Sequence, residues 1–136
     1  MAKSAFQKMF QTDRNLEEEG VIVDFGQGVK VKVARMQSER SRAVRRRLEK
    51  PYRKRFQQND VPDDVMENIL ICQMAEGIIL GWEGVTDEEG HPLECTEGNI
   101  KKVLTKFPDF KDAVAQASMT RETFMQEEAE EDLKNS

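Results

Sequence analysis

Residues that commonly perform catalysis or bind metals are scarce in this sequence, which has one histidine and two cysteines among 136 residues. His91 lies in a Gly-His-Pro turn, and the local sequence places no serine or cysteine as its activated partner. Cys72 and Cys95 lack Cys-X-X-Cys spacing, and Cys95, Glu94 and His91 do not make the four ligands that a zinc site requires. We therefore expect a protein that is not an enzyme, with no catalytic residue, no metal site and no cofactor.

Long hydrophobic runs are also missing. The longest apolar stretch, residues 69–80, is interrupted by Gln73 and Glu76 and is too short to span a bilayer. The first ten residues carry Lys3 and Lys8 but no continuous apolar segment, so we expect neither a signal peptide nor a membrane anchor. With two cysteines outside any disulfide pattern, the sequence predicts a reduced, cytoplasmic protein that does not contact membranes.

Positive charge is in the minority overall, because the chain has a formal net charge of -5. This balance disfavours binding to nucleic acid or to an anionic membrane. The positive residues are nevertheless concentrated, since residues 40–55 hold nine basic residues against a single acidic one, Glu49. Those nine are Arg40, Arg42, Arg45, Arg46, Arg47, Lys50, Arg53, Lys54 and Arg55.

So many like charges three and four residues apart on one helix repel each other, and this predicts an acidic partner for the basic helix. The partner could be the acidic residues 121–136, within one chain or between copies that self-associate. An acidic protein and, less favoured by the net charge, a nucleic acid are the alternatives. We choose Arg42, Arg45, Arg46 and Arg53 as candidate protein-binding residues.

The single tryptophan, Trp82, is a fifth candidate for protein binding. It directly follows the longest apolar stretch. A tryptophan in that place can fill the core, or it can anchor an interface, because large aromatic residues dominate interface hot spots. The sequence leaves both readings open.

Residues 20–35 predict an antiparallel β-hairpin. Val29, Val31 and Val33 alternate with basic residues, which is typical of a strand with one buried face. The Gly-Gln-Gly sequence at 26–28 suits the positive φ angles of a tight hairpin turn.

Helical periodicity follows in four segments, at about 38–57, 63–80, 97–107 and 109–118. Ser38 and Thr96 are placed to cap the first and third segments, and Pro51 is expected to kink the first. These signals predict an α+β fold: one N-terminal antiparallel β-hairpin packed on a predominantly α-helical domain. The expected organisation is a flexible lead-in over 1–19, a single domain over 20–118, and an acidic, fraying or disordered tail over 119–136.

The order of these elements resembles a known family. The resemblance rests on the following segments: Glu19-Gly20-Val21-Ile22-Val23-Asp24-Phe25-Gly26, Val31-Lys32-Val33-Ala34-Arg35, Lys50-Pro51-Tyr52-Arg53, and Leu80-Gly81-Trp82-Glu83-Gly84-Val85-Thr86-Asp87 with Gly90 and Pro92-Leu93. Together they resemble the tail assembly chaperones of long-tailed, siphovirus-type bacteriophages. The resemblance spans roughly residues 20–117.

This resemblance implies a protein of virion morphogenesis that binds the tape measure protein, keeps it soluble and helps recruit the tail tube protein. It implies action in the host cell cytoplasm and absence from the mature virion. It does not identify contact residues, so the five candidates above rest on their chemistry. The alternatives are a structural tail or connector subunit, and a small nucleic-acid-binding regulator that uses the basic helix 40–55.

Overall fold

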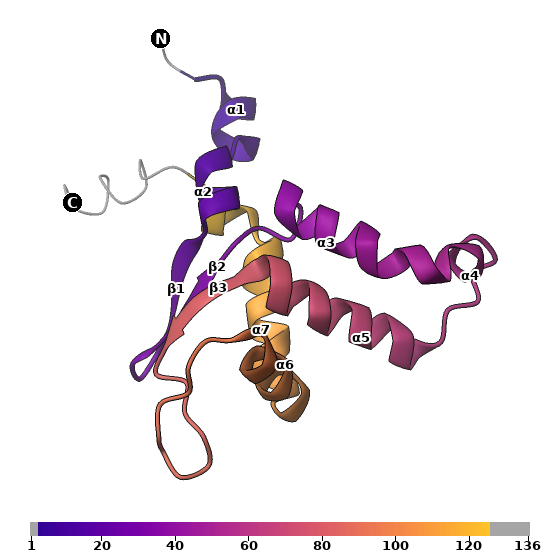
Figure 1. Cartoon of the computed structure of the whole chain (residues 1–136). Coiled ribbons are helices and arrows are strands. Elements are labelled where there is room, and N and C mark those ends of the chain that lie inside the picture. Colours follow the sequence, from indigo (N-terminus) through magenta and orange to yellow (C-terminus); the bar gives the residue numbers. More distant parts are fainter. Residues whose placement is uncertain (1–2, 126–136) are drawn as a thin grey trace.

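The protein is built from short helices and three strands, with helices covering one face of the sheet (Figure 1). The computed structural model describes residues 3–125. The strands are β1 (Val21–Gly26), β2 (Val29–Val33) and β3 (Ile79–Glu83). The α-helices are α1 (Ala5–Phe10), α2 (Arg14–Glu19), α3 (Glu39–Glu49), α4 (Arg53–Gln57), α5 (Asp63–Gln73), α6 (Glu97–Lys106) and α7 (Pro108–Met119). Three further helical turns are η1 (Lys50–Tyr52), η2 (Met74–Ile78) and η3 (Arg121–Phe124), of which η2 is π-helical.

The sheet is antiparallel with strand order β1-β2-β3. Between β1 and β2, Gly26, Gln27 and Gly28 have φ angles of 89°, 54° and 83°, the positive values expected for this turn. In the middle strand, Val31 faces Val23 on one side and Trp82 on the other.

One face of the sheet is buried in the hydrophobic core. Val31 and Val33 of β2 are fully buried there, as their alternation with lysines predicts. They pack with side chains from η2, α6 and α7, namely Met74, Ala75, Ile78, Ile100, Leu104, Val114 and Ala115. The helices therefore supply the cover that three strands need to be stable.

The expected fold of one N-terminal hairpin on a helical domain is wrong in two respects. The sheet has a third strand, β3, and two helices, α1 and α2, precede the first strand. The helix expected over 63–80 ends at Gln73, and the chain passes through the π-helical turn η2 into β3. A short continuous apolar run such as Ile78-Ile79-Leu80 has no period that separates a buried strand from a buried helix, so the sequence pattern misassigned it.

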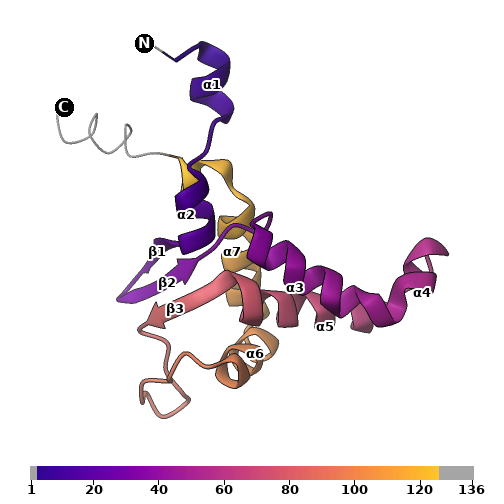
Figure 2. The ribbon, with the colours of Figure 1, turned by 45° about the horizontal axis from the view of Figure 1, so that its top comes forward.

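The lead-in expected over residues 1–19 contains α1 and α2, and α2 is joined to the body. Arg35 donates from Nη1 to Glu17 Oε1 at 2.9 Å, and the backbone N–H of Glu39 donates to Glu18 Oε1 at 2.6 Å. These contacts place α2 beside the start of α3, as Figure 2 shows.

The tail expected from residue 119 onward differs from what the structure has. Met119 is the last residue of α7, Arg121–Phe124 form η3, and the Phe124 ring is fully buried. Its carbonyl accepts the backbone N–H of Asp13 at 2.8 Å, which joins the two ends of the described chain. The rest of the expected tail, 126–136, and its suggested pairing with the basic helix lie outside the described residues.

Candidate protein-binding site

The basic residues lie on an arm, defined here as residues 39–73, that extends away from the sheet (Figures 1 and 2). Its first side is α3, η1 and α4, and α5 returns alongside α3. Ser38 caps α3, because its Oγ accepts the backbone N–H of Ser41 at 3.2 Å. Pro51 falls in η1, where its missing N–H costs least, and so the helix changes direction without ending.

A buried polar contact fixes α3 to α5 where the arm meets the body. Gln73 is 1% exposed, and its Nε2 donates to Ser41 Oγ at 2.8 Å and to the Ser41 carbonyl at 3.3 Å. Both groups are fully desolvated, so this contact holds the two helices in one register.

Two of the nine arm cations are engaged by carboxylates. Arg45 pairs with Glu49 on the same helix and also reaches Gln73 Oε1 at 3.5 Å. Arg47 pairs with Glu76 of η2. Both arginines therefore contribute to the arm's own structure.

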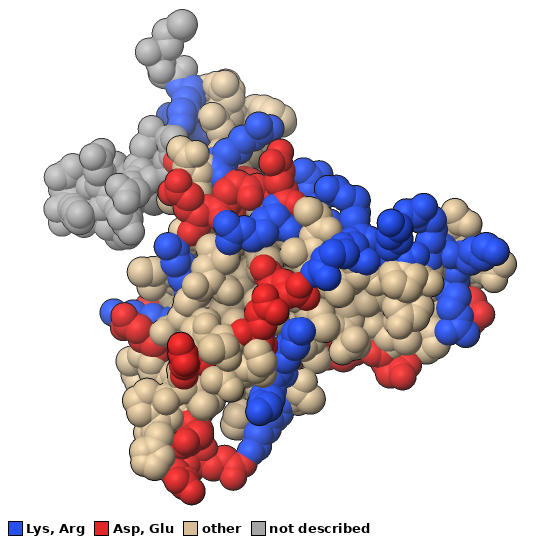
Figure 3. Space-filling view, in the orientation of Figure 1, with Lys and Arg blue, Asp and Glu red and all other residues tan. Residues whose placement is uncertain are grey.

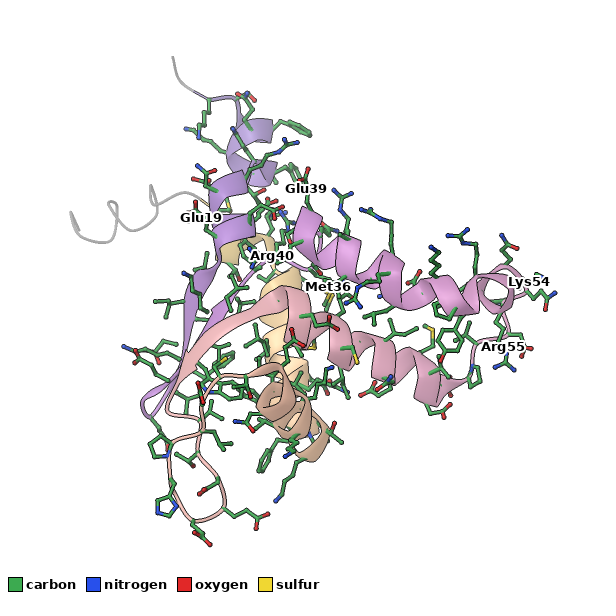
Figure 4. All side chains as sticks on the ribbon, viewed as in Figure 1. Glu19, Met36, Glu39, Arg40, Lys54 and Arg55 are labelled. Atoms are coloured by element: carbon green, nitrogen blue, oxygen red, sulfur yellow. The ribbon has the colours of Figure 1, made fainter. Side chains whose placement is uncertain are left out.

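The other seven cations are exposed, and none of their side chains has an ion pair or hydrogen bond with any residue in the range 3–125. They are Arg40, Arg42, Arg46, Lys50, Arg53, Lys54 and Arg55. Figure 3 shows the resulting positive surface along α3 and α4, and Figure 4 labels Arg40, Lys54 and Arg55 on it. Mutual repulsion among these charges is uncompensated by the part of the chain that the structure describes.

The structure separates the five candidate residues into three groups. Arg42, Arg46 and Arg53 are exposed and unpaired among residues 3–125, so they are available to a partner. Arg45 is held by Glu49, as described above. Trp82 lies on β3 in the body, packed against the core, and its Nε1 donates to the Leu93 carbonyl at 2.8 Å. Trp82 thus has a structural role and does not join the arm surface.

A second contact ties the arm to the body through α5. Lys111 of α7 pairs with Glu67 of α5, and the Lys111 side chain is 11% exposed. The hydrogen bond to Glu67 raises the pKa of Lys111 above its ordinary value, with smaller contributions from the charges of Glu67 and Asp112. Sequence inspection did not find this pair because 44 residues separate its members.

Glu67→Gln is expected to lower the free energy of unfolding by about 0.5 kcal/mol near neutral pH, because Glu67 is half exposed and such pairs are weak. Since the folded-state pKa of Lys111 is raised, the pair contributes fully below about pH 10.4. The difference between wild type and variant should then shrink as the pH rises through the raised pKa. Urea unfolding at pH 7, 9 and 11 tests this, and a difference that is unchanged at pH 11 would contradict it.

Cys95 and His91 lie outside the arm, whereas Cys72 lies on α5 within it. Burial raises the pKa of the Cys95 thiol, which disfavours the reactive thiolate. His91 is 71% exposed, and its Nδ1 lies 3.5 Å from carboxylate oxygens of Asp87 and Glu89. Within residues 3–125 no group of three or more histidine, cysteine or acidic residues is arranged to hold a metal. Over the same range no helix combines the length and the apolar character needed to cross a membrane.

Comparison with known proteins gives one family. A family model described as "YdaY prophage protein" matches residues 36–135, which include the arm, β3, α6 and α7. Neither the curated proteins nor the solved structures contain a match. The family match covers more than half of the chain and shows a phage-derived protein, without reaching the finer level of a tail assembly chaperone. The chain therefore belongs to the YdaY prophage protein family.

Proposed function

We propose that this prophage protein is a non-catalytic tail assembly chaperone that binds the tape measure protein through its basic arm. The observation that carries the proposal is the set of seven exposed arm cations with no partner among residues 3–125, on a chain whose net charge is -5. Such a surface attracts an acidic partner and aligns it, while the acidic remainder of the protein repels other surfaces of that partner.

The proposal also draws on the sequence resemblance and on the family. The segment Leu80–Asp87 and the helix pattern after it resemble tail assembly chaperones, and the YdaY match is to a prophage protein. In this function the protein keeps the tape measure protein soluble in the host cytoplasm and helps recruit tail tube subunits. It leaves before the virion is complete.

The test is co-expression with the tape measure protein encoded in the same prophage, followed by solubility and pull-down measurements. Wild type should make the tape measure protein soluble and co-purify with it. Arg42→Glu combined with Arg46→Glu should reduce the co-purified amount about tenfold, because two attractive contacts become repulsive. Arg45 is left in place, since its reversal would put a carboxylate beside Glu49 and disturb the arm itself.

The matched control is Lys8→Glu with Lys102→Glu, two exposed cations outside the arm that produce the same change in net charge. The control should co-purify the tape measure protein as well as wild type does. Failure of the wild-type protein to solubilise or bind the tape measure protein would overturn the proposal. Equal losses in both double variants would show that net charge matters and the arm surface does not.

A structural subunit of the tail stays in the finished phage particle, whereas a chaperone does not. Mass spectrometry of purified phage particles, induced from the prophage, should find this protein at less than about one copy per particle if it is a chaperone, since only structural subunits are retained stoichiometrically. Several copies in each particle would contradict the chaperone proposal.

A further inference from the structure

Four of the seven unpaired arm cations lie in one row on the outer side of α3, η1 and α4. Successive members are four, four and three residues apart, the spacing that places side chains on one face of a helix, and they are Arg42, Arg46, Lys50 and Arg53. All four are exposed, and at 1.5 Å per residue the row is about 17 Å long. We call these four residues the cation row.

The cation row points away from the second helix of the arm. Val44 and Leu48 are half-buried, and each lies two residues, a little more than half a helical turn, from Arg42 or Arg46. Because α3 packs against α5 and η2, this half-buried side faces them and the cation row faces solvent. In Figure 3 the positive side chains follow the outer edge of the arm, and a smaller negative patch lies on the α5 side.

The carboxylates of the arm do not neutralise the cation row. Glu49 is paired with Arg45, and Glu39 lies in the first turn of α3, before the row begins. The acidic residues of α5 are about 10 Å or more from the row, because packed helix axes are roughly 8–10 Å apart and the row lies on the far side of α3. Charges at that distance are largely screened in physiological salt, where the Debye length is about 8 Å. The net charge of -5 therefore has little influence on a ligand at the row.

The cation row offers charge without exposed apolar or aromatic anchors. Among residues 3–125, the exposed large apolar side chains include one on the arm, Met66, and it lies on α5. Tyr52 and Phe56 are half-buried. A protein partner needs apolar contacts at the centre of its interface, and single-stranded nucleic acid stacks its bases on exposed aromatic rings. The phosphate backbone of a duplex, by contrast, is held by arginine and lysine alone.

We infer that the cation row binds the phosphate backbone of double-helical nucleic acid. A duplex carries one negative charge per roughly 1.7 Å of its axis, so a row about 17 Å long meets enough phosphates for each of its four cations to neutralise one. Contacts of this kind hold the backbone and carry no sequence information directly. The inference goes beyond the proposed function, because it gives the same arm a second ligand of a different class.

The test measures binding of a DNA duplex of about 20 base pairs to the full-length protein at several salt concentrations, by fluorescence anisotropy. With four phosphate contacts, the logarithm of the association constant should fall with the logarithm of the salt concentration at a slope of about -3.6. Arg42→Gln combined with Arg46→Gln should weaken binding about tenfold and change the slope to about -1.8, because two contacts are lost. Both side chains are exposed, so the fold should not change.

The matched control is Lys8→Gln with Lys102→Gln, which removes the same charge from exposed positions outside the arm. This variant should keep the affinity and the salt slope of wild type. Undetectable binding at low salt, or a slope near zero, would overturn the inference. Equal losses in the two double variants would also overturn it, because the effect would then come from net charge and not from the cation row.

Competition with poly-glutamate tests a protein partner in place of nucleic acid. Poly-glutamate should displace the duplex only when its carboxylates are in large excess over phosphates, because a duplex presents its charges at higher density on a preformed surface. If poly-glutamate displaces the duplex at equal charge concentration, the row is no better suited to phosphates than to protein carboxylates, and the inference is overturned.

The duplex measurement needs no tape measure protein, so its outcome is separate from that of the proposed function. A protein that solubilises the tape measure protein but has no affinity for the duplex would overturn this inference alone. Duplex binding through the cation row, with a tape measure protein that stays insoluble, would overturn the proposed function alone.

Discussion

Phe124→Ala is expected to lower the free energy of unfolding by about 3–5 kcal/mol, as is usual for a fully buried phenylalanine. The ring has no exposed surface, and Phe124 is the largest fully buried side chain among residues 3–125. It lies under the Arg35 guanidinium, 5.8 Å from the ring centroid, and its backbone carbonyl holds Asp13. Removing the ring leaves a cavity where η3, α2 and the start of β1 meet.

The matched control is Phe6→Ala, because Phe6 is 73% exposed on α1. Its replacement should change stability by less than about 1 kcal/mol. Chemical unfolding followed by circular dichroism measures both variants. Similar small losses at the two positions would show that residues 121–124 do not belong to the cooperative fold.

Gly77→Ala is expected to destabilise the protein by about 1–3 kcal/mol through overpacking. Gly77 lies in the π-helical turn η2, and a Cβ added there would be 3.0 Å from Ser41 Cα and 3.4 Å from Val44 Cγ2. The first of these atoms is backbone, so α3 would have to move. That movement would strain the hydrogen bonds between Gln73 and Ser41.

Gly98→Ala is the control for Gly77→Ala, because a Cβ at Gly98 meets no atom within 4 Å in the described structure. Gly98 lies in α6, where alanine is the better helix former, so this change should be neutral or stabilising by up to about 1 kcal/mol. Thermal unfolding of the two variants and wild type gives the comparison. A Gly77→Ala variant as stable as Gly98→Ala would contradict the close packing of α3 on η2.

Elements that depend on local signals were predictable. The Gly-Gln-Gly turn has the required positive φ angles, and the side chains of Ser38 and Thr96 accept the backbone N–H groups that cap α3 and α6. Each of these features is decided by residues within a few positions of one another. The sequence also located the arm's basic residues, because charge is a property of composition alone.

Elements that depend on distant partners were not predictable in the same way. β3 exists because its backbone pairs with β2, about 50 residues earlier in the chain, and the apolar run containing it carries no period of its own. Phe124 is followed by a long acidic stretch, and the composition of that stretch predicted a fraying tail. The burial of Phe124, a single aromatic residue, depends on distant parts of the fold and was not predicted.

By itself, the sequence determined the hairpin, the starts of α3, α5 and α6, and the concentration of positive charge between residues 40 and 55, because each depends on neighbouring residues or on composition. Only the tertiary structure decided which of those charges are paired by side chains among residues 3–125. Arg47 is neutralised by Glu76 and Arg45 is drawn toward Gln73, whereas Arg42 and Arg46 on the same helix face solvent. The difference arises because side chains on one helix meet different surroundings, and those surroundings come from segments that folding brings together.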